Sequence, residues 1–205
     1  MVLGRLFRKR VSGNYVLDTS LFVNPDARKY FGETVDGALS AFLEQAAKLK
    51  SVQFYMPPSV QKELKYFAQK ELPNFKHAII IKSPALHEMK IPAIVMWKLL
   101  DEMRTRVNAG LRVSEKFVKD QKMPMDEKVH KLRIQYKEAL REGILDSEED
   151  FEVLMLAKEL NAAILTLDQG LVRAAEELGI RCMAVEAFSA HLKELYSKGH
   201  KNLGI

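Results

Sequence analysis

The sequence predicts an α/β protein with a doubly wound parallel sheet, into which a protruding antiparallel helical hairpin is inserted. Short apolar runs alternate with segments of helical length and periodicity over most of the chain, as in strand–helix–strand units. The run 162–167 is apolar at almost every position, as expected of a parallel strand buried on both faces. A length of 205 residues suits one such domain with an insertion.

The part of the chain before the insertion is expected to form three strands and two helices. Residues 1–13 are basic and precede the first apolar run, so they are predicted to be an N-terminal extension. The strands are expected at 14–17, 52–56 and 78–81, and the helices at about 34–50 and from 57 to Pro73. Pro57 and Pro58 favour a helix start there, because proline fits the first turn of a helix.

A helical hairpin is predicted for residues 91–143, which interrupt the alternation. Apolar side chains recur there at a spacing of about 3.5 residues, the pattern of a helix that pairs with another helix. The first helix carries this pattern at Met96, Met103, Val107, Leu111 and Phe117, and the second carries it at Val129, Leu132 and Tyr136. Pro124 interrupts the pattern between them, so the two helices are expected to be antiparallel.

The outer faces of this hairpin are basic. Residues 98–141 contain 12 Lys and Arg against 7 Asp and Glu, a surplus equal to the net charge of +5 of the whole chain. A basic arm beside an acidic site suits a polyanionic substrate, and nucleic acid is the obvious candidate. The alternative is a solvated coiled coil whose charges only maintain solubility. The predicted RNA-binding side chains are Arg104, Arg106, Arg112, Lys116, Lys119, Lys122, Lys128 and Lys131.

Residues 144–205 are expected to complete the domain that residues 14–90 begin. The expected order is a helix at 146–160, a strand at 162–167, a helix at 171–178, a strand at 181–185 and a final helix at about 186–198. The continued alternation of helix and strand keeps the sheet parallel, with helices on both of its faces.

Composition excludes several classes of protein. Apolar residues are 47% of the chain and no apolar run approaches the roughly 20 residues that span a bilayer, so a membrane protein is not expected. The basic N-terminus is not followed by an apolar segment of signal-peptide length, which predicts a cytoplasmic location. Cys182 is the only cysteine and the five histidines lack ligand spacing, so neither an internal disulfide nor a zinc site is expected.

Four aspartates are predicted to meet at one edge of the sheet. Asp18 and Asp168 each end an apolar run, and open parallel sheets place their ligands at this carboxyl edge. Asp146 and Asp150 lie four residues apart, so on a helix they would share one face. If the two strands are neighbours, such like charges stay ionised together only when a cation lies between them. The pattern therefore indicates a metal site.

Each of these acids also has a purely structural interpretation. Asp150 lies at the third position of a capping box that Ser147 would begin, and acids in a first helical turn are stabilised by the helix dipole. Asp18 and Asp168 could simply cap the segments that follow them. The metal-site prediction therefore depends on their conjunction at one edge.

Three further side chains are weaker candidates. Glu63 is a fifth possible ligand, in the helix after the second strand, but it could equally be a solvated helix residue. Thr19 and Ser20 could orient Asp18 or hold a metal-bound water, or they could merely form a hydroxyl turn.

Three motifs in order carry a resemblance to a known family. YVLDTSLF, PPSVQKEL and DSEEDFEVLMLAKELNAAILTLDQGL resemble the motifs of PIN-domain metallonucleases. The stretches VLDTSLFVNPDARKYFG and IKSPALHEMKIPA, together with the basic hairpin, resemble more closely the HARP family, the small protein-only form of RNase P once labelled RNA ligase partner protein. The resemblance covers nearly the whole chain after the basic extension, which departs from the family pattern.

This resemblance implies a PIN-like fold and a nuclease that removes the 5′ leader of precursor tRNA with a divalent metal, Mg²⁺ or Mn²⁺. The family's active-site aspartates map here onto Asp18, Asp146, Asp150 and Asp168, with Glu63 at a position where PIN nucleases often carry another acid. The hairpin is implied to bind RNA and to build a homo-oligomer, for which a dodecamer is one candidate.

Two other functions remain open from the sequence. A different PIN ribonuclease, such as a toxin that cuts one particular RNA, would share the acidic site, although a long basic hairpin is not expected in a minimal toxin. A non-catalytic RNA-binding partner of an RNA ligase would use only the basic surface. Metal-dependent cleavage separates the second alternative from RNase P.

Overall fold

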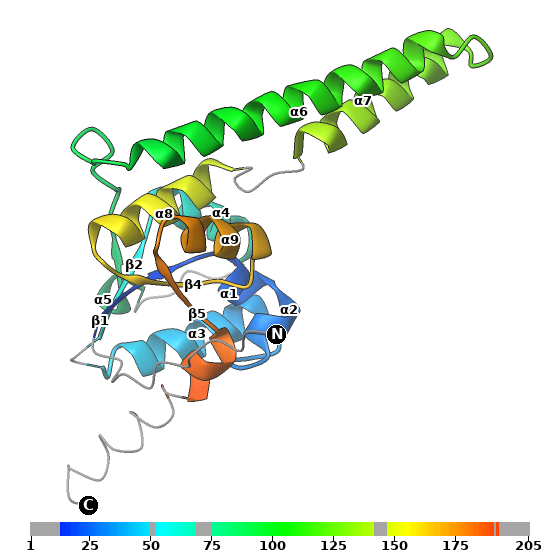
Figure 1. The fold of residues 1–205 in the computed structure, drawn as a ribbon. Coiled ribbons are helices and arrows are strands. Elements are labelled where there is room, and N and C mark those ends of the chain that lie inside the picture. Colours follow the sequence, from blue (N-terminus) through cyan, green and yellow to red (C-terminus); the bar gives the residue numbers. More distant parts are fainter. Residues whose placement is uncertain (1–12, 50–51, 69–74, 142–146, 191, 193–205) are drawn as a thin grey trace, which may run out of the picture.

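A five-stranded parallel sheet forms the centre of the protein (Figure 1). The computed structural model describes residues 13–49, 52–68, 75–141, 147–190 and 192. The strands are β1 (Gly13–Leu17), β2 (Val52–Met56), β3 (Ile79–Ile81), β4 (Ala163–Leu165) and β5 (Arg181–Met183), in the order β3-β2-β1-β4-β5. Every neighbouring pair is parallel, which confirms the predicted α/β class.

Helices cover both faces of this sheet (Figure 1). They are α1 (Ser20–Val23), α2 (Pro25–Arg28), α3 (Val35–Ala46), α4 (Pro58–Phe67), α5 (Phe75–Ala78), α6 (Ala93–Lys119), α7 (Met125–Arg141), α8 (Glu148–Glu159) and α9 (Gln169–Glu177), and residues 185–190 are also helical. In Figure 1, α4, α8 and α9 lie above the sheet, whereas α3 and the helix at 185–190 lie below it. The sheet is therefore doubly wound, as predicted.

An aromatic cluster fills the layer between the sheet and α3. Phe42 of α3 packs edge-on against Phe22 and Phe54, with ring centroids 5.4 and 5.0 Å apart, and Phe188 lies 5.8 Å from Phe54. All four rings are almost completely buried. Because Phe22 belongs to α1, this cluster anchors the segment that directly follows β1, where the acidic residues begin.

The strand order places β1 beside β4 at the centre of the sheet. Leu17 pairs with Leu165, and the backbone N–H of Asp18 donates to the Leu165 carbonyl at 3.3 Å. The chain moves outward from β1 in one direction through β2 and β3, and in the other through β4 and β5. Between β1 and β4 the connections leave the sheet in opposite directions, so the carboxyl ends of these two strands border a crevice.

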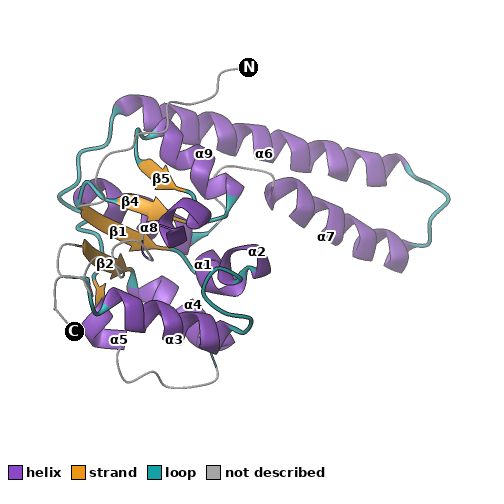
Figure 2. Cartoon of the chain, turned by 90° about the horizontal axis from the view of Figure 1, so that it is seen from below, coloured by secondary structure: helices purple, strands orange, loops and turns teal. Residues whose placement is uncertain are grey.

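Helices α6 and α7 project from the sheet domain as a long arm (Figure 2). The two helices pack against each other over the length of α7, and Gly110 is buried where they meet. The predicted pairing positions Met103, Val107 and Leu111 are instead more than half exposed, so that part of the spacing prediction was wrong. A Cβ atom at Gly110 would come within 2.7 Å of the Tyr136 ring, so only glycine permits this approach. A salt bridge of 3.0 Å between Lys98 and Glu177 joins the base of the arm to α9. Among the described helices none is apolar and long enough to cross a membrane.

Several element boundaries differ from the prediction. The short helices α1, α2 and α5 were not predicted, because four-residue helices carry no periodic signal. Strand β4 ends at Leu165, so Asp168 follows the strand by three residues instead of ending it. The predicted extension at 1–13 and the end of the final helix fall largely outside the described residues.

Candidate active site

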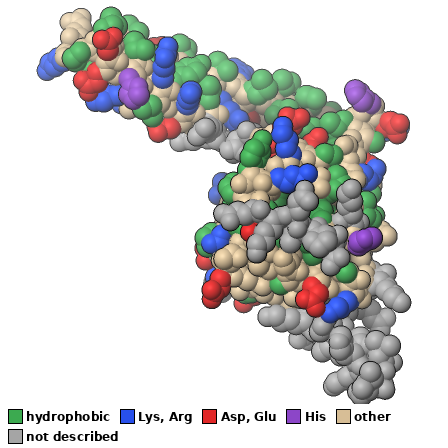
Figure 3. Space-filling view, turned by 180° about the vertical axis from the view of Figure 1, so that it is seen from behind, with side chains coloured by type: hydrophobic (Ala, Val, Ile, Leu, Met, Phe, Trp, Pro, Cys, Tyr) green, Lys and Arg blue, Asp and Glu red, His purple; other side chains and the backbone are tan. Residues whose placement is uncertain are grey.

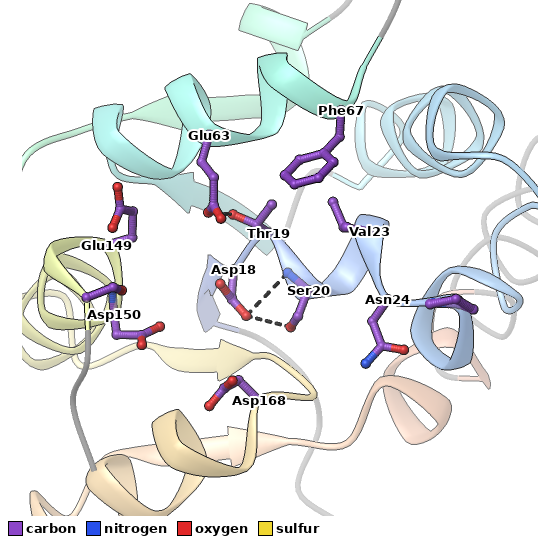
Figure 4. Close-up of a pocket in the computed structure, with 12 residues that line it drawn as sticks. Asp18, Thr19, Ser20, Val23, Asn24, Glu63, Phe67, Glu149, Asp150 and Asp168 are labelled. Atoms are coloured by element: carbon purple, nitrogen blue, oxygen red, sulfur yellow. Dashed lines mark hydrogen bonds between the residues drawn. The ribbon is translucent and has the colours of Figure 1, made fainter. Parts of the chain in front are cut away.

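An open cavity of about 580 Å³ lies at the carboxyl edge of β1 and β4 (Figure 4). Acidic and hydroxyl side chains from four separate parts of the chain meet in its wall. The lining residues are Asp18, Thr19, Ser20, Val23, Asn24, Pro25, Glu63, Phe67, Ser147, Glu149, Asp150 and Asp168. The cavity thus contains three of the four predicted catalytic aspartates and the fifth candidate, Glu63.

Asp18 is held in place by two hydroxyl groups. Its side chain is 7% exposed, and its Oδ2 accepts from Ser20 Oγ at 2.5 Å and from Thr166 Oγ1 at 2.6 Å. Ser20 Oγ in turn accepts from the backbone N–H of Leu167 at 3.1 Å, and Thr166 Oγ1 accepts from that of Asp168 at 2.9 Å. Each hydroxyl group therefore accepts one hydrogen bond and donates another, and this fixes the direction of its O–H bond.

This network fixes which oxygen of Asp18 faces the cavity. Oδ2 carries both hydroxyl contacts and a third, longer one of 3.3 Å from the Ser20 backbone N–H. Among the described residues no hydrogen bond reaches Oδ1, and Figure 4 shows the carboxylate directed into the cavity between Asp150 and Asp168. The expectation that Ser20 orients Asp18 matches this geometry, and Thr166 is a second such group that was not predicted from the sequence.

Asp168 has a structural role as well as a place in the cavity. It is the N-cap of α9, and its Oδ1 accepts from the backbone N–H of Leu171 at 2.8 Å. The capping interpretation therefore holds for Asp168, as it does for the α8 start, where the Asp150 N–H donates to Ser147 Oγ at 3.0 Å. Capping occupies one Asp168 oxygen and leaves the other available to the cavity.

The helix that carries Asp150, α8, begins two residues later than predicted. Ser147 is the N-cap of α8 with an extended backbone, so the helix begins at Glu148, after Asp146 in the chain. That Asp146 and Asp150 share one face of a helix stays a prediction. Asp146 itself lies outside the described residues. Asp150 lines the cavity together with Glu149, an acid that was not predicted from the sequence.

Glu63 faces the cavity from α4, the helix that packs beside α8. Thr19 donates its hydroxyl proton to Glu63 Oε2, which links α4 to the turn after β1. Thr19 is 5% exposed and Asp18 lies next to it, so the same turn is held by Glu63 on one side and by Thr166 on the other. Glu63 is not a freely solvated helix residue, which was the alternative for it.

The types of ligand atom in the cavity wall suit a hard divalent cation. Carboxylate and hydroxyl oxygens are the ligands preferred by Mg²⁺ and Mn²⁺, and the described lining residues include neither His nor Cys. Among the residues that the structure describes, however, no three His, Cys, Asp or Glu side chains are grouped closely enough to hold a metal ion. The described geometry is an acidic cavity open to solvent, and Asp146 could add to it only from outside the described ranges.

The predicted RNA-binding side chains all lie on the arm. Arg104, Arg112, Lys116, Lys119, Lys122 and Lys131 are exposed, whereas Arg106 and Lys128 are half-buried. Arg106 forms a 2.7 Å ion pair with Glu102, and Lys128 donates to the Asp120 backbone carbonyl at the turn of the arm. These two side chains therefore stabilise the arm itself, which makes them weaker candidates for RNA contacts than the exposed six.

Two of the site residues that were not predicted carried a signal in the sequence. Thr166 lies two residues before Asp168, and residues two apart in an extended segment share a side. Phe67 lies four residues after Glu63, and residues four apart on a helix also share a face.

Comparison with known proteins identifies the family of this chain. The PINc domain ribonuclease family matches residues 14–197. The RNA-free ribonuclease P of Pyrococcus horikoshii is 46% identical over 90% of this chain and 93% of its own length. The protein of the same name from Thermodesulfovibrio yellowstonii is 45% identical over 91% and 95%. A PilT N-terminus domain protein from Sulfolobus solfataricus, with a solved structure, is 16% identical with a TM-score of 0.40 over 87% and 92% of the two chains.

The match to the nuclease family runs from Asn14 in β1 to residue 197, so it includes the described strands, the cavity and the arm. The resemblance seen in the three sequence motifs is confirmed by identity over nearly the full length of both chains. The chain belongs to the PINc-domain ribonucleases and, among them, to the RNA-free ribonuclease P (HARP) family.

Proposed function

We propose that the chain is a protein-only RNase P, an endoribonuclease that hydrolyses precursor tRNA at the mature 5′ end. The products are a leader with a 3′-hydroxyl and a tRNA with a 5′-phosphate. The observation that supports this most directly is the cavity lined by Asp18, Asp150 and Asp168, in a chain 46% identical to an RNA-free ribonuclease P. Its open shape admits a phosphodiester backbone from solvent.

The proposed metal ligands are the aspartates of the cavity. Asp18 would contribute Oδ1, and Asp168 the oxygen that does not cap α9. Asp150 would approach from the first turn of α8; Asp146 completes the predicted set, with Glu63 as a further candidate. Mg²⁺ or Mn²⁺ bound there would supply an activated water and neutralise charge on the scissile phosphate.

The protein's own contribution is to hold these carboxylates in place before RNA arrives. Ser20 and Thr166 fix Asp18 against the turn that begins α9, so the ends of β1 and β4 are joined through side chains as well as through the sheet. A carboxylate locked by such donors loses little freedom when it binds a cation, which favours a reactive geometry.

The arm, residues 91–143 in the proposed domain division, is suited to two roles. The six exposed members of the predicted RNA-binding set would contact RNA phosphates, because A-form RNA hides most base edges from side chains. Figure 3 shows apolar side chains along one edge of the arm and basic ones along the other. Exposed apolar residues of α6 include Trp97, Leu100, Met103, Val107 and Leu111. This edge would pair subunits in a homo-oligomer, with a dodecamer as one candidate state.

The test is cleavage of 5′-labelled precursor tRNA with Mg²⁺, in parallel with EDTA, Asp18→Asn and Glu44→Gln. Glu44 is the matched control, since it is an exposed acid on α3 that pairs with Lys48 and does not line the cavity. We expect cleavage at the mature 5′ end by the wild type and by Glu44→Gln, and none with EDTA. Asp18→Asn should lower kcat by about a hundredfold or more while RNA affinity is retained.

Other outcomes would identify the rival functions. Cleavage of other RNAs but not of precursor tRNA would favour a toxin-like PIN ribonuclease. Tight RNA binding without any metal-dependent cleavage would favour a non-catalytic partner of an RNA ligase. Equal cleavage by Asp18→Asn and the wild type would overturn the assignment of the cavity as the active site.

A further inference from the structure

The cavity has an acidic part and an apolar part, and only the acidic part is used by the proposed hydrolysis. Asp150, Glu149 and Glu63 lie on one side of Asp18, and Val23, Asn24 and Phe67 lie on the other (Figure 4). The second group has no carboxylate, so metal binding does not explain it.

Phe67 is a large apolar side chain that lines the cavity without being packed into the core. It is the last residue of α4 and remains 45% exposed, whereas Val60 and Leu64 of the same helix are 0% and 2% exposed. It does not belong to the side chains that pack against the core. Because Phe67 lies one turn after Glu63, the same face of α4 presents a carboxylate to the acidic part and an aromatic ring to the apolar part.

Asn24 adds an oriented hydrogen-bond donor to this part of the cavity. Its Oδ1 caps α2 by accepting from the backbone N–H of Asp26 at 2.9 Å. The amide is therefore fixed with its NH₂ group on the other side, and Figure 4 shows that nitrogen towards the cavity. Val23, which packs partly against the core, forms the adjacent apolar wall.

We propose that this apolar part, formed by Phe67, Val23 and Asn24, binds the base of the last leader nucleotide, next to the scissile phosphate. A nucleobase is flat and aromatic at its faces and polar at its edge. The Phe67 ring would stack on its face, and the Asn24 amide would donate to an acceptor at its edge or to the adjoining phosphate.

The chemistry of the substrate selects this nucleotide. When the scissile phosphate lies beside the carboxylates, the nucleoside before it and the nucleoside after it reach opposite parts of the cavity. The leader is single-stranded, so its last base can turn onto an aromatic ring without breaking a base pair, whereas the first base of the mature tRNA is held in the acceptor stem. Stacking accepts any base, because every base has a π-face, so one site would serve precursors with different leaders. This inference rests on the proposed function.

The experiment compares wild type, Phe67→Ala, Phe67→Trp and Tyr66→Ala on two substrates. One is an intact precursor tRNA, and the other lacks the base of the last leader nucleotide. Tyr66 is the matched control, since it is the neighbouring aromatic residue, 77% exposed and outside the cavity lining. We expect Phe67→Ala to lower kcat/KM on the intact RNA about tenfold, the effect typical of one stacked base. On the abasic RNA it should have no further effect.

A second readout does not require cleavage. Precursor tRNA with 2-aminopurine at the last leader position is titrated with protein in EDTA. Stacking on Phe67 should quench its fluorescence with the wild type, Phe67→Trp and Tyr66→Ala, but not with Phe67→Ala. If the wild type cleaves no precursor, the proposed function fails, and the quenching alone still decides whether the base site exists.

Three results would overturn the inference. The first is Phe67→Ala cleaving the intact RNA as well as the wild type and quenching 2-aminopurine equally. The second is the same decrease on intact and abasic substrates, which would make Phe67 a structural residue. The third is a difference in particle mass between Phe67→Ala and the wild type, measured by sedimentation, which would assign Phe67 to a contact between subunits.

Discussion

Replacing Thr166 by Val tests how the active-site carboxylate is positioned. The change preserves the shape of a side chain that is 3% exposed, but it removes the donor to Asp18 Oδ2 and the acceptor for the Asp168 backbone N–H. A hydrogen bond to a charged group contributes about 1.5–3 kcal/mol, and a buried N–H left without a partner costs about 1–3 kcal/mol. Since solvent in the open cavity offsets part of both, we expect the free energy of unfolding to fall by about 2–3 kcal/mol.

The effect on catalysis should exceed the effect on RNA binding. Without Thr166, Asp18 keeps the donor from Ser20 but can rotate, and misplacement of about 1 Å can cost about a hundredfold in rate. We expect Thr166→Val to lower kcat by roughly ten- to a hundredfold with little change in KM, and to raise the Mg²⁺ concentration needed for half-maximal rate. Thr166→Ser retains the hydroxyl and should recover most of the activity.

The assays are single-turnover cleavage of precursor tRNA across a Mg²⁺ titration, and urea unfolding followed by circular dichroism. The reasoning is refuted if Thr166→Val cleaves at the wild-type rate at every Mg²⁺ concentration. It is also refuted if Thr166→Ser is as impaired as Thr166→Val, because the hydroxyl would then be irrelevant and only the volume of the side chain would matter.

The remaining predictions concern the arm, the cysteine and RNA binding. Gly110→Ala should weaken packing of α6 on α7 by about 1–3 kcal/mol, because the new methyl group meets the Tyr136 ring. Amide hydrogen exchange in α7 should therefore accelerate. Adding Tyr136→Ala to the Gly110→Ala variant should slow the exchange again, because it removes the ring that the methyl group meets. Burial raises the pKa of the Cys182 thiol from 9.0 to about 11, so the unfolded chain ionises first and the free energy of unfolding should fall as pH rises from 9 towards 11. Cys182→Ser should abolish that part of the pH dependence, and an unchanged slope would contradict it. Replacing Lys116 and Lys119 by Gln should weaken precursor tRNA binding and make the slope of log Kd against log salt shallower, by about 0.7–0.9 for each phosphate that the variant no longer binds. A parallel shift of the two lines would argue against phosphate binding by these lysines.

The sequence by itself determined the fold class and the chemistry of the site. Alternation of apolar runs with helical segments is sufficient for a parallel sheet, because a parallel strand needs a crossover that packs back on the sheet. The aspartates that follow the apolar runs at 14–17 and 162–167 then lie at the carboxyl edge of the sheet, and this holds for any order of the strands. Asp18 and Asp168 were predicted on these local grounds, and both line the cavity together with Asp150, which was predicted from its helical spacing.

Only the tertiary structure decided how these carboxylates are held. Thr166 and Asp18 are 148 residues apart in the chain, and their contact follows from the pairing of β1 with β4, which no local pattern specifies. The start of α8 is a local feature by contrast: a helix was predicted from residue 146, and the structure instead makes Ser147 its N-cap, as the capping-box interpretation of the sequence had it. Phe67 reads as one more apolar helix residue in the sequence. Its exposure beside the acidic cavity results from where α4 ends against the sheet, and this is a property of packing rather than of composition.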